Sequence, residues 1–151
     1  MADTYRRHAL IAAPIDDVWS IVSDPHTHPD WWPELQGVED AVEGIDGEYV
    51  RRTKRFGFLD IVDTVWVMEP MEQLREVNFR CTVSGAYTRF SLTPAQDDTF
   101  VEIEGGVAPI GLQGRMMKAA GPIFFKRWLG ELLDALPKVV AGGKGAPPTR
   151  A

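Results

Sequence analysis

Hydrophobic residues spaced three and four apart predict a helix near the start of the chain. Ile15, Val18, Trp19 and Val22 fall on one face of a helix with 3.6 residues per turn. Pro14 suits the first turn of this helix, because its missing N–H would have no partner there in any case. The periodic pattern ends at the Ser-Asp-Pro sequence that follows Val22.

The segments around this helix have other patterns. Residues 5–11 predict a first strand, and a polar segment containing two prolines and two histidines follows the helix over residues 24–30. We expect residues 24–30 to form a loop and residues 30–35 to form a second short helical turn, which Pro33 would limit.

The middle of the chain, residues 38–107, changes to short strands joined by turns. The strands are expected over residues 49–56, 60–68, 74–83, 87–93 and 99–104. In the 74–83 strand Val77, Phe79 and Cys81 share one face, while polar residues occupy the other. Short turns between such strands predict an antiparallel meander with one covered face and one wet face.

The strand expected over 60–68 does not show this alternation. Val65 and Val67 lie on one face, and Trp66 and Met68 lie on the other. Both faces are therefore apolar, and the sequence leaves open which of them points inward.

The last third of the chain predicts a long amphipathic helix. Its apolar stripe consists of Phe125, Trp128, Leu129, Leu132, Leu133 and Leu136. Met116, Met117 and Phe124 extend the stripe backwards, with a kink or a break at Gly121-Pro122. We expect one domain over residues 1–140 and a disordered tail, rich in glycine and proline, over residues 141–151.

Composition narrows the classes of function. The 151 residues fit one domain, and a formal net charge of -6 argues against an indiscriminate nucleic-acid binder. The single cysteine, Cys81, excludes an intrachain disulfide. No apolar run approaches the about 18 residues that a membrane-spanning helix needs, and the N-terminus shows no apolar core of signal-peptide length. We therefore expect a cytoplasmic protein that is not integral to a membrane.

The order of these elements resembles the START-like (SRPBCC) superfamily, and in particular its polyketide cyclase/dehydrase and lipid transport group. The resemblance rests on residues 11–14 followed by Val18-Trp19, on Trp32-Pro33, and on the turn at Glu69-Pro70. It implies an α+β helix-grip fold. In that fold a curved antiparallel sheet wraps around the long C-terminal helix, and two short helices follow the first strand.

The resemblance also implies an apolar cavity between the sheet and the long helix. Its expected guest is a small hydrophobic molecule that is lipid-like, aromatic or a polyketide, bound without a cofactor, in a monomer or a homodimer. The residues that we expect to line this cavity are Trp32, Tyr49, Trp66, Phe79, Cys81, Phe90, Met116, Met117 and Phe124. For each of them, ordinary core packing is the alternative reading.

Two other functions stay open at this stage. A polyketide cyclase/dehydrase would need a group that polarises a carbonyl and a general base beside it. The candidates are Tyr49, Arg51, Tyr87 and Arg89 for the first role, and Asp63, Glu102 and Glu104 for the second. Strand alternation places Arg89, Glu102 and Glu104 on the wet face, which weakens them. The other alternative is an interaction module of the heat-shock ATPase activator kind.

The polar segment over residues 24–30 has the residue types of a metal site. Asp24, His26, His28 and Asp30 alternate along it, and histidine with carboxylate is a common set of zinc ligands. Alternate residues of a loop converge on one ion only when the backbone is held, and no companion ligand has a recognisable spacing. We therefore expect a solvated loop over the mouth of the cavity, and no metal.

Overall fold

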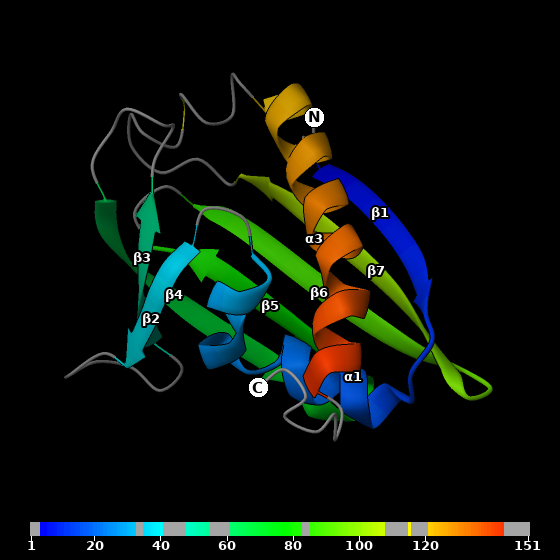
Figure 1. The fold of residues 1–151 in the computed structure, drawn as a ribbon. Helices are drawn as coiled ribbons and strands as arrows, with labels where there is room; N and C mark the ends of the chain where they lie inside the picture. Colours follow the sequence, from blue (N-terminus) through cyan, green and yellow to red (C-terminus); the bar gives the residue numbers. More distant parts are fainter. Residues whose placement is uncertain are drawn as a thin grey trace.

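The computed structural model of the protein describes residues 4–32, 35–40, 48–54, 61–82, 85–107, 115 and 121–143. A seven-stranded antiparallel sheet, in the order β1-β7-β6-β5-β4-β3-β2, curves around one long helix (Figure 1). The elements are β1 Thr4–Ile11, α1 Ile15–Val22, η1 Pro25–Asp30, β2 Leu35–Asp40, β3 Glu48–Lys54, β4 Ile61–Met71, η2 Glu72–Leu74, β5 Glu76–Cys81, β6 Ala86–Ala95, β7 Asp98–Val107 and α3 Gly121–Gly143. The predicted α+β helix-grip fold is confirmed.

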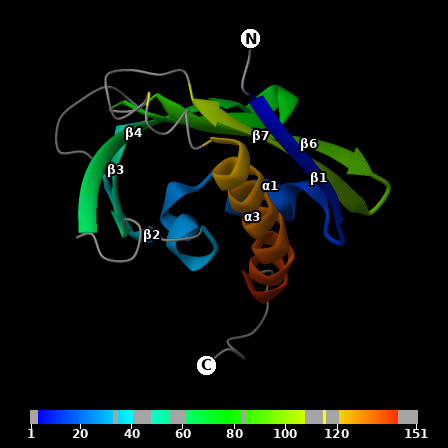
Figure 2. The same ribbon diagram turned by 90° about the horizontal axis from the view of Figure 1, so that it is seen from above.

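The concave side of the sheet holds the helical elements. Figure 2 shows α3 within the bend of the sheet, with η1 between α3 and strand β2. The short helix η1 contacts both β2 and α1, and α3 packs mainly on β1 and β7. The chain segment that follows α1 therefore fills part of the space that the curved sheet encloses.

The strand order shows how the first strand of the chain joins the open sheet, in which β1 and β2 are the two edge strands. Consecutive strands pair from β2 to β7, and β1 then pairs with β7, so that Thr4 lies opposite Gly106 and Ile11 opposite Thr99. The predicted covered face is confirmed, since Val77 and Phe79 are fully buried. Gly85, which precedes β6, has a φ of 81°, in the left-handed region that favours glycine.

The second short helix does not lie where the sequence suggested. The expected turn over residues 30–35 is wrong, because the helical turn is η1, Pro25–Asp30, and β2 already begins at Leu35. Asp24 caps η1 by accepting a hydrogen bond from the backbone N–H of His26 (3.0 Å). The Thr27 hydroxyl donates to the Ile21 carbonyl (2.7 Å), which ties η1 back to α1.

Two strands run through prolines at which we expected turns. Strand β4 continues past Pro70 to Met71, and β6 continues past Pro94 to Ala95. Among the described residues, both prolines have a strand partner on one side only: Pro70 pairs with Val77, and Pro94 pairs with Thr99. Such an edge position does not need the N–H that proline lacks.

The inward side of β4, which the sequence left open, is the side of Trp66 and Met68. Trp66 lies opposite Tyr49 on β3 and Cys81 on β5, both of which are buried, and Met68 lies opposite Phe79. Since directly paired residues project to the same face of a sheet, Trp66 and Met68 face α3.

The long helix matches the predicted stripe where its side chains are described. Leu129, Leu132, Leu133 and Leu136 are buried, and Trp128 is half-buried. The helix α3 starts at Gly121 and continues to Gly143, three residues beyond the point where we expected the tail to begin. Residues 144–151 lie outside the described residues. None of the helices in the described part of the chain has both the length and the apolar character to cross a membrane.

Candidate functional site

A cluster of aromatic rings lies on the inner face of the sheet. Trp32, which follows η1, stacks on the imidazole of His28 with ring centroids 4.4 Å apart. Its ring also meets Phe79 of β5 edge-on at 5.6 Å and lies 6.0 Å from Phe90 of β6. Trp32 is 3% exposed and the two phenylalanines are 0% exposed, so these rings form a closed floor without room for water between them.

The cluster opens toward the long helix. Trp128 of α3 lies 6.0 Å from Trp32, edge-on. Trp128, Trp66 and Met68 pack against the core and are only half-buried. Trp66 and Met68 lie on the concave face of the sheet, and Trp128 lies on α3. The resemblance implies a ligand between these two elements.

A charged side chain, Arg51 of β3, lies within this aromatic cluster. Its guanidinium carbon is 4.5 Å from the ring centre of Trp32 and 4.0 Å from that of Trp66. The residue is 1% exposed, which is rare for arginine. Its Nε and Nη1 atoms have no hydrogen-bond partner, and within the described ranges no carboxylate forms an ion pair with it.

Tyr49, two residues before Arg51 on the same strand, does not neutralise this charge. Burial raises the pKa of Tyr49 to about 12, although the positive charge of Arg51 acts in the opposite direction. The phenol therefore stays protonated at neutral pH, and its hydroxyl lies beside the Arg51 guanidinium without a hydrogen bond of good geometry. Burial lowers the pKa of the Arg51 guanidinium, but arginine starts so high that it keeps its charge.

His28 is the second buried polar side chain of the cluster. Its Nε2 lies 3.2 Å from the Val22 carbonyl. A carbonyl can only accept, so Nε2 carries the proton and Nδ1 is left as a bare acceptor without a partner. Burial, followed by the charge of Arg51, lowers the pKa of His28 to about 3, and the ring is neutral at physiological pH.

The predicted lining residues are brought together in part. Trp32, Tyr49, Trp66, Phe79 and Phe90 meet in this cluster. Cys81 faces the same side of the sheet but packs with Ala86 and Val107 in a neighbouring cluster. Met116, Met117 and the side chain of Phe124 lie outside the described residues. Whether any of these residues contacts a ligand stays a prediction.

Three residues of the cluster had not been assigned to the lining: His28, Trp31 and Trp128. His28 was placed in a solvated loop, which is wrong, because it is 0% exposed and stacks within the core. Arg51 had been considered only as a catalytic candidate. Its inward position follows from the period of a strand, because residues 49 and 51 must face the same way.

Two of the three carboxylates considered as general bases, Glu102 and Glu104, do not reach the cluster. Glu102 is exposed, and Glu104 pairs with Arg6 at 3.3 Å and accepts a hydrogen bond from Tyr87. Arg89 is exposed as well, and the side chain of Asp63 lies outside the described residues. Among the described side chains, Arg51 and Tyr49 face the interior without a carboxylate beside them.

The suspected metal ligands over residues 24–30 do not converge. Asp24 caps η1, and His28 is turned into the core. No group of three or more metal-ligating side chains occurs among the residues with a described position.

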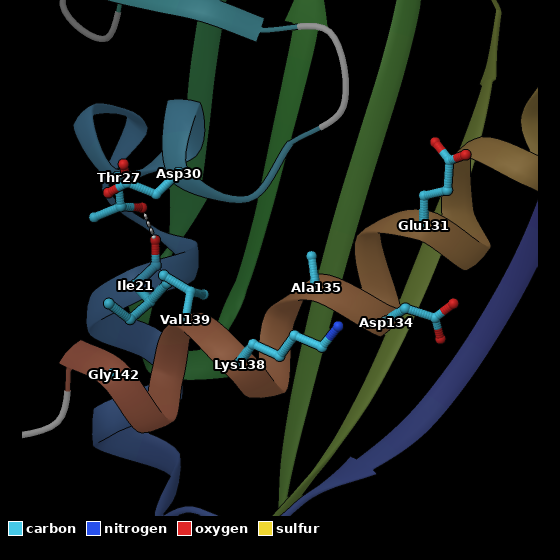
Figure 3. A pocket seen from close by; sticks show the side chains of 9 residues that line it. All are labelled: Ile21, Thr27, Asp30, Glu131, Asp134, Ala135, Lys138, Val139 and Gly142. Carbon is cyan, nitrogen blue, oxygen red and sulfur yellow. Dashed lines mark hydrogen bonds between the residues drawn. The ribbon is translucent and has the colours of Figure 1, made fainter. Parts of the chain in front are cut away.

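An open groove runs along the solvent side of this region. It has a volume of about 670 Å³ and separates α3 from α1 and η1 (Figure 3). Ile21, Ala135 and Val139 provide its apolar surface, and Asp30 and Glu131 lie at its rim. The groove is open to solvent and is not enclosed between the sheet and α3.

Replacing Arg51 with methionine is expected to leave the free energy of unfolding unchanged or to raise it by up to about 2 kcal/mol. Burying the charge of Arg51 destabilises the folded protein by several kcal/mol. Its contacts with two aromatic faces stabilise the folded protein by about 2 kcal/mol each. Urea unfolding measures the difference. A loss above about 1 kcal/mol would mean that Arg51 has a structural partner and would contradict this account.

The comparisons with known proteins agree with this geometry. The family described as polyketide cyclase/dehydrase and lipid transport matches residues 3–141. No curated protein matches the chain in sequence.

Solved structures share the fold at low sequence identity. A START superfamily protein from Mycobacterium smegmatis superposes with a TM-score of 0.70 at 21% identity, over 91% of this chain and 96% of that one. The protein TTHA0849 from Thermus thermophilus gives 0.70 at 15% identity, over 93% and 98%. The Zhui aromatase/cyclase from Streptomyces sp. R1128 gives 0.67 at 16% identity, over 92% and 93%. With its sequence matched over nearly the whole length, this chain belongs to the polyketide cyclase/dehydrase and lipid transport family.

Proposed function

We propose that the protein binds a small hydrophobic molecule between the concave face of the sheet and α3. The observation that carries this proposal is the convergence of aromatic rings from η1 and its flank, from four strands and from α3 on one inward face, with Trp66 and Trp128 still partly accessible. A rigid aromatic surface suits a flat apolar guest. Burying about 200 Å² of such a guest contributes roughly 5 kcal/mol before ordering costs.

The closed floor limits where the guest lies. Phe79 and Phe90 are fully buried beneath Trp32, so a ligand does not fit under Trp32 without displacing it. The guest would lie against the half-buried faces of Trp66, Met68 and Trp128. Trp32, which contacts both the floor and Trp128, would form the boundary of the site.

The enzyme alternative has one observation in its favour. Arg51 and Tyr49 are donors that face the interior, as polarising a carbonyl of a polyketide would require. No carboxylate is among the described side chains of the cluster, and with its pKa lowered to about 3 by burial His28 is only a weak base. Binding is therefore the function that the geometry supports best.

The interaction-module alternative rests on apolar side chains at the surface. Leu10 is 59% exposed and Phe100 is 38% exposed, and the two residues pair across β1 and β7. A stable protein interface buries about 800 Å² on each partner, far more than two side chains provide.

Replacing Trp32 with alanine is expected to weaken the binding of an apolar fluorescent probe, N-phenyl-1-naphthylamine, by about tenfold without unfolding the protein. The indole forms one wall of the proposed site, and the loss of an aromatic wall corresponds to at least about 1.4 kcal/mol. Fluorescence titration gives the affinity, and circular dichroism checks the fold.

The matched control is Trp19→Ala. Trp19 is also buried, at 8% exposure, but it lies on α1 beside Arg75. This variant should keep the affinity of the unmodified protein for the probe. Equal affinities in all three proteins would show that Trp32 is not part of the site. If native mass spectrometry detects no bound apolar molecule, either co-purified or added, the proposal of binding itself is contradicted.

A further inference from the structure

We propose that the ligand is an organic acid, and that Arg51 binds its carboxylate. This inference rests on the proposed function and narrows the class of its ligand. It starts from the buried and unpaired guanidinium between Trp32 and Trp66.

The environment of Arg51 stabilises its charge only in part. The indoles of Trp32 and Trp66 supply negative ring faces at 4.5 and 4.0 Å. The N–H groups of Nε and Nη1 remain without acceptors although they are buried. A guanidinium is a charged, planar array of donors, and an oxygen anion is the acceptor that both pairs with the donors and balances the charge.

The neighbouring polar groups also favour an acceptor on the ligand. Trp32 Nε1 is buried without a partner and can only donate, and the neutral phenol of Tyr49 can donate as well. Together with Arg51, these groups form a set of donors with one positive charge. Among the described rings of the cluster, Nδ1 of His28 is the one unpartnered atom that can accept but not donate.

This set of groups also excludes other ligand classes. A cation would be repelled by Arg51, and a fully apolar lipid would leave the donors of Arg51 unpaired. A flat aromatic acid would instead satisfy both parts of the site. Its rings would lie on the half-buried indoles of Trp66 and Trp128, and its anion would meet the buried guanidinium once Trp32, which lies against it, is displaced.

The test compares two probes that share one ring system. 2-Naphthoate carries a carboxylate, and 2-acetylnaphthalene has nearly the same size but is neutral. At pH 7, isothermal titration calorimetry is expected to show that the protein binds 2-naphthoate at least about tenfold more tightly, as a charge-assisted hydrogen bond in a desolvated site would give. Arg51→Gln should bring the two affinities within about twofold, mainly by weakening the binding of 2-naphthoate.

The matched control is Arg89→Gln, which removes an exposed arginine from the outer face of the sheet. This variant should keep the full preference for the acid. Because both variants lose one positive charge, the comparison shows whether the preference depends on the contact with Arg51 or only on the net charge of the protein. If Arg51→Gln does not fold, Arg51→Met takes its place, because it is expected to be at least as stable as the unmodified protein.

The outcomes separate the two proposals. Equal binding of both probes to the unmodified protein, or an acid preference that survives Arg51→Gln, overturns the role of Arg51 and leaves the hydrophobic site standing. Failure of both probes to bind overturns the proposed function and this inference with it.

Discussion

Lowering the pH from 7 to 5 is expected to reduce the free energy of unfolding by about 2 kcal/mol through His28 alone. Burial holds the pKa of His28 at about 3 in the folded protein, against 6.5 for a free histidine. Between about pH 3 and pH 6.5 the unfolded chain binds a proton at His28, whereas the folded protein does not. The free energy of unfolding therefore rises with pH across this window, by about 1.36 kcal/mol per unit of pH. Above pH 6.5 the contribution of His28 has reached its full value.

Urea unfolding at pH 7 and pH 5 tests this dependence. His28→Phe keeps an aromatic ring against Trp32 but cannot be protonated, so about 2 kcal/mol of the difference between the two pH values should disappear. The control is His8→Gln, because His8 is an exposed histidine on β1 and its removal should leave the dependence intact. An unchanged pH dependence in His28→Phe would show that His28 does not titrate as its burial implies.

The neutral state of His28 also bears on the proposed anion site. Arg51 and His26 are the positive or titratable groups whose charges act on His28, and both lower its pKa. A protonated His28 would place a second buried cation beside Arg51, on the other side of the Trp32 indole. The site as described therefore contains one buried positive charge, which suits a ligand with a single negative charge.

The fold could be predicted because its signals are local and repeated. The alternation of Val77, Phe79 and Cys81 and the stripe from Leu129 to Leu136 each determine a face without knowledge of the rest of the chain. Strand alternation also predicted that Phe79 and Phe90 would be covered. The order of the elements then indicated the family, and the family match over residues 3–141 confirms it.

The site could be predicted only in part because it depends on contacts between distant segments. Residues 24–30 look polar in sequence, yet the Asp24 cap and the Thr27 hydrogen bond turn His28 into the core beneath the sheet. Whether a buried arginine has a carboxylate partner is a question of tertiary structure, which periodicity cannot answer. Arg51 could be placed on the inner face from strand alternation, but its lack of a partner could not be foreseen.

Replacing Leu129 with alanine should lower the free energy of unfolding by about 2–5 kcal/mol. Leu129 is 0% exposed on the face of α3 that packs against the sheet, and the substitution leaves a cavity that the neighbouring side chains fill only partly. Leu10→Ala is the matched control, since Leu10 is 59% exposed on β1 and the same change should cost less than about 0.5 kcal/mol.

The size of the loss at Leu129 also reports on how the helix and the sheet meet. A loss near 5 kcal/mol would indicate that the side chains around Leu129 are held rigidly and cannot fill the cavity. A ligand would then find no space at Leu129 and would have to lie at the half-buried Trp66 and Trp128. A loss below about 1 kcal/mol would contradict the burial of Leu129, because a tightly packed leucine cannot be removed at so small a cost. The free energy of unfolding of Leu129→Ala therefore shows how tightly α3 packs against the sheet. It also shows whether this part of the interior is too closely packed to admit a ligand.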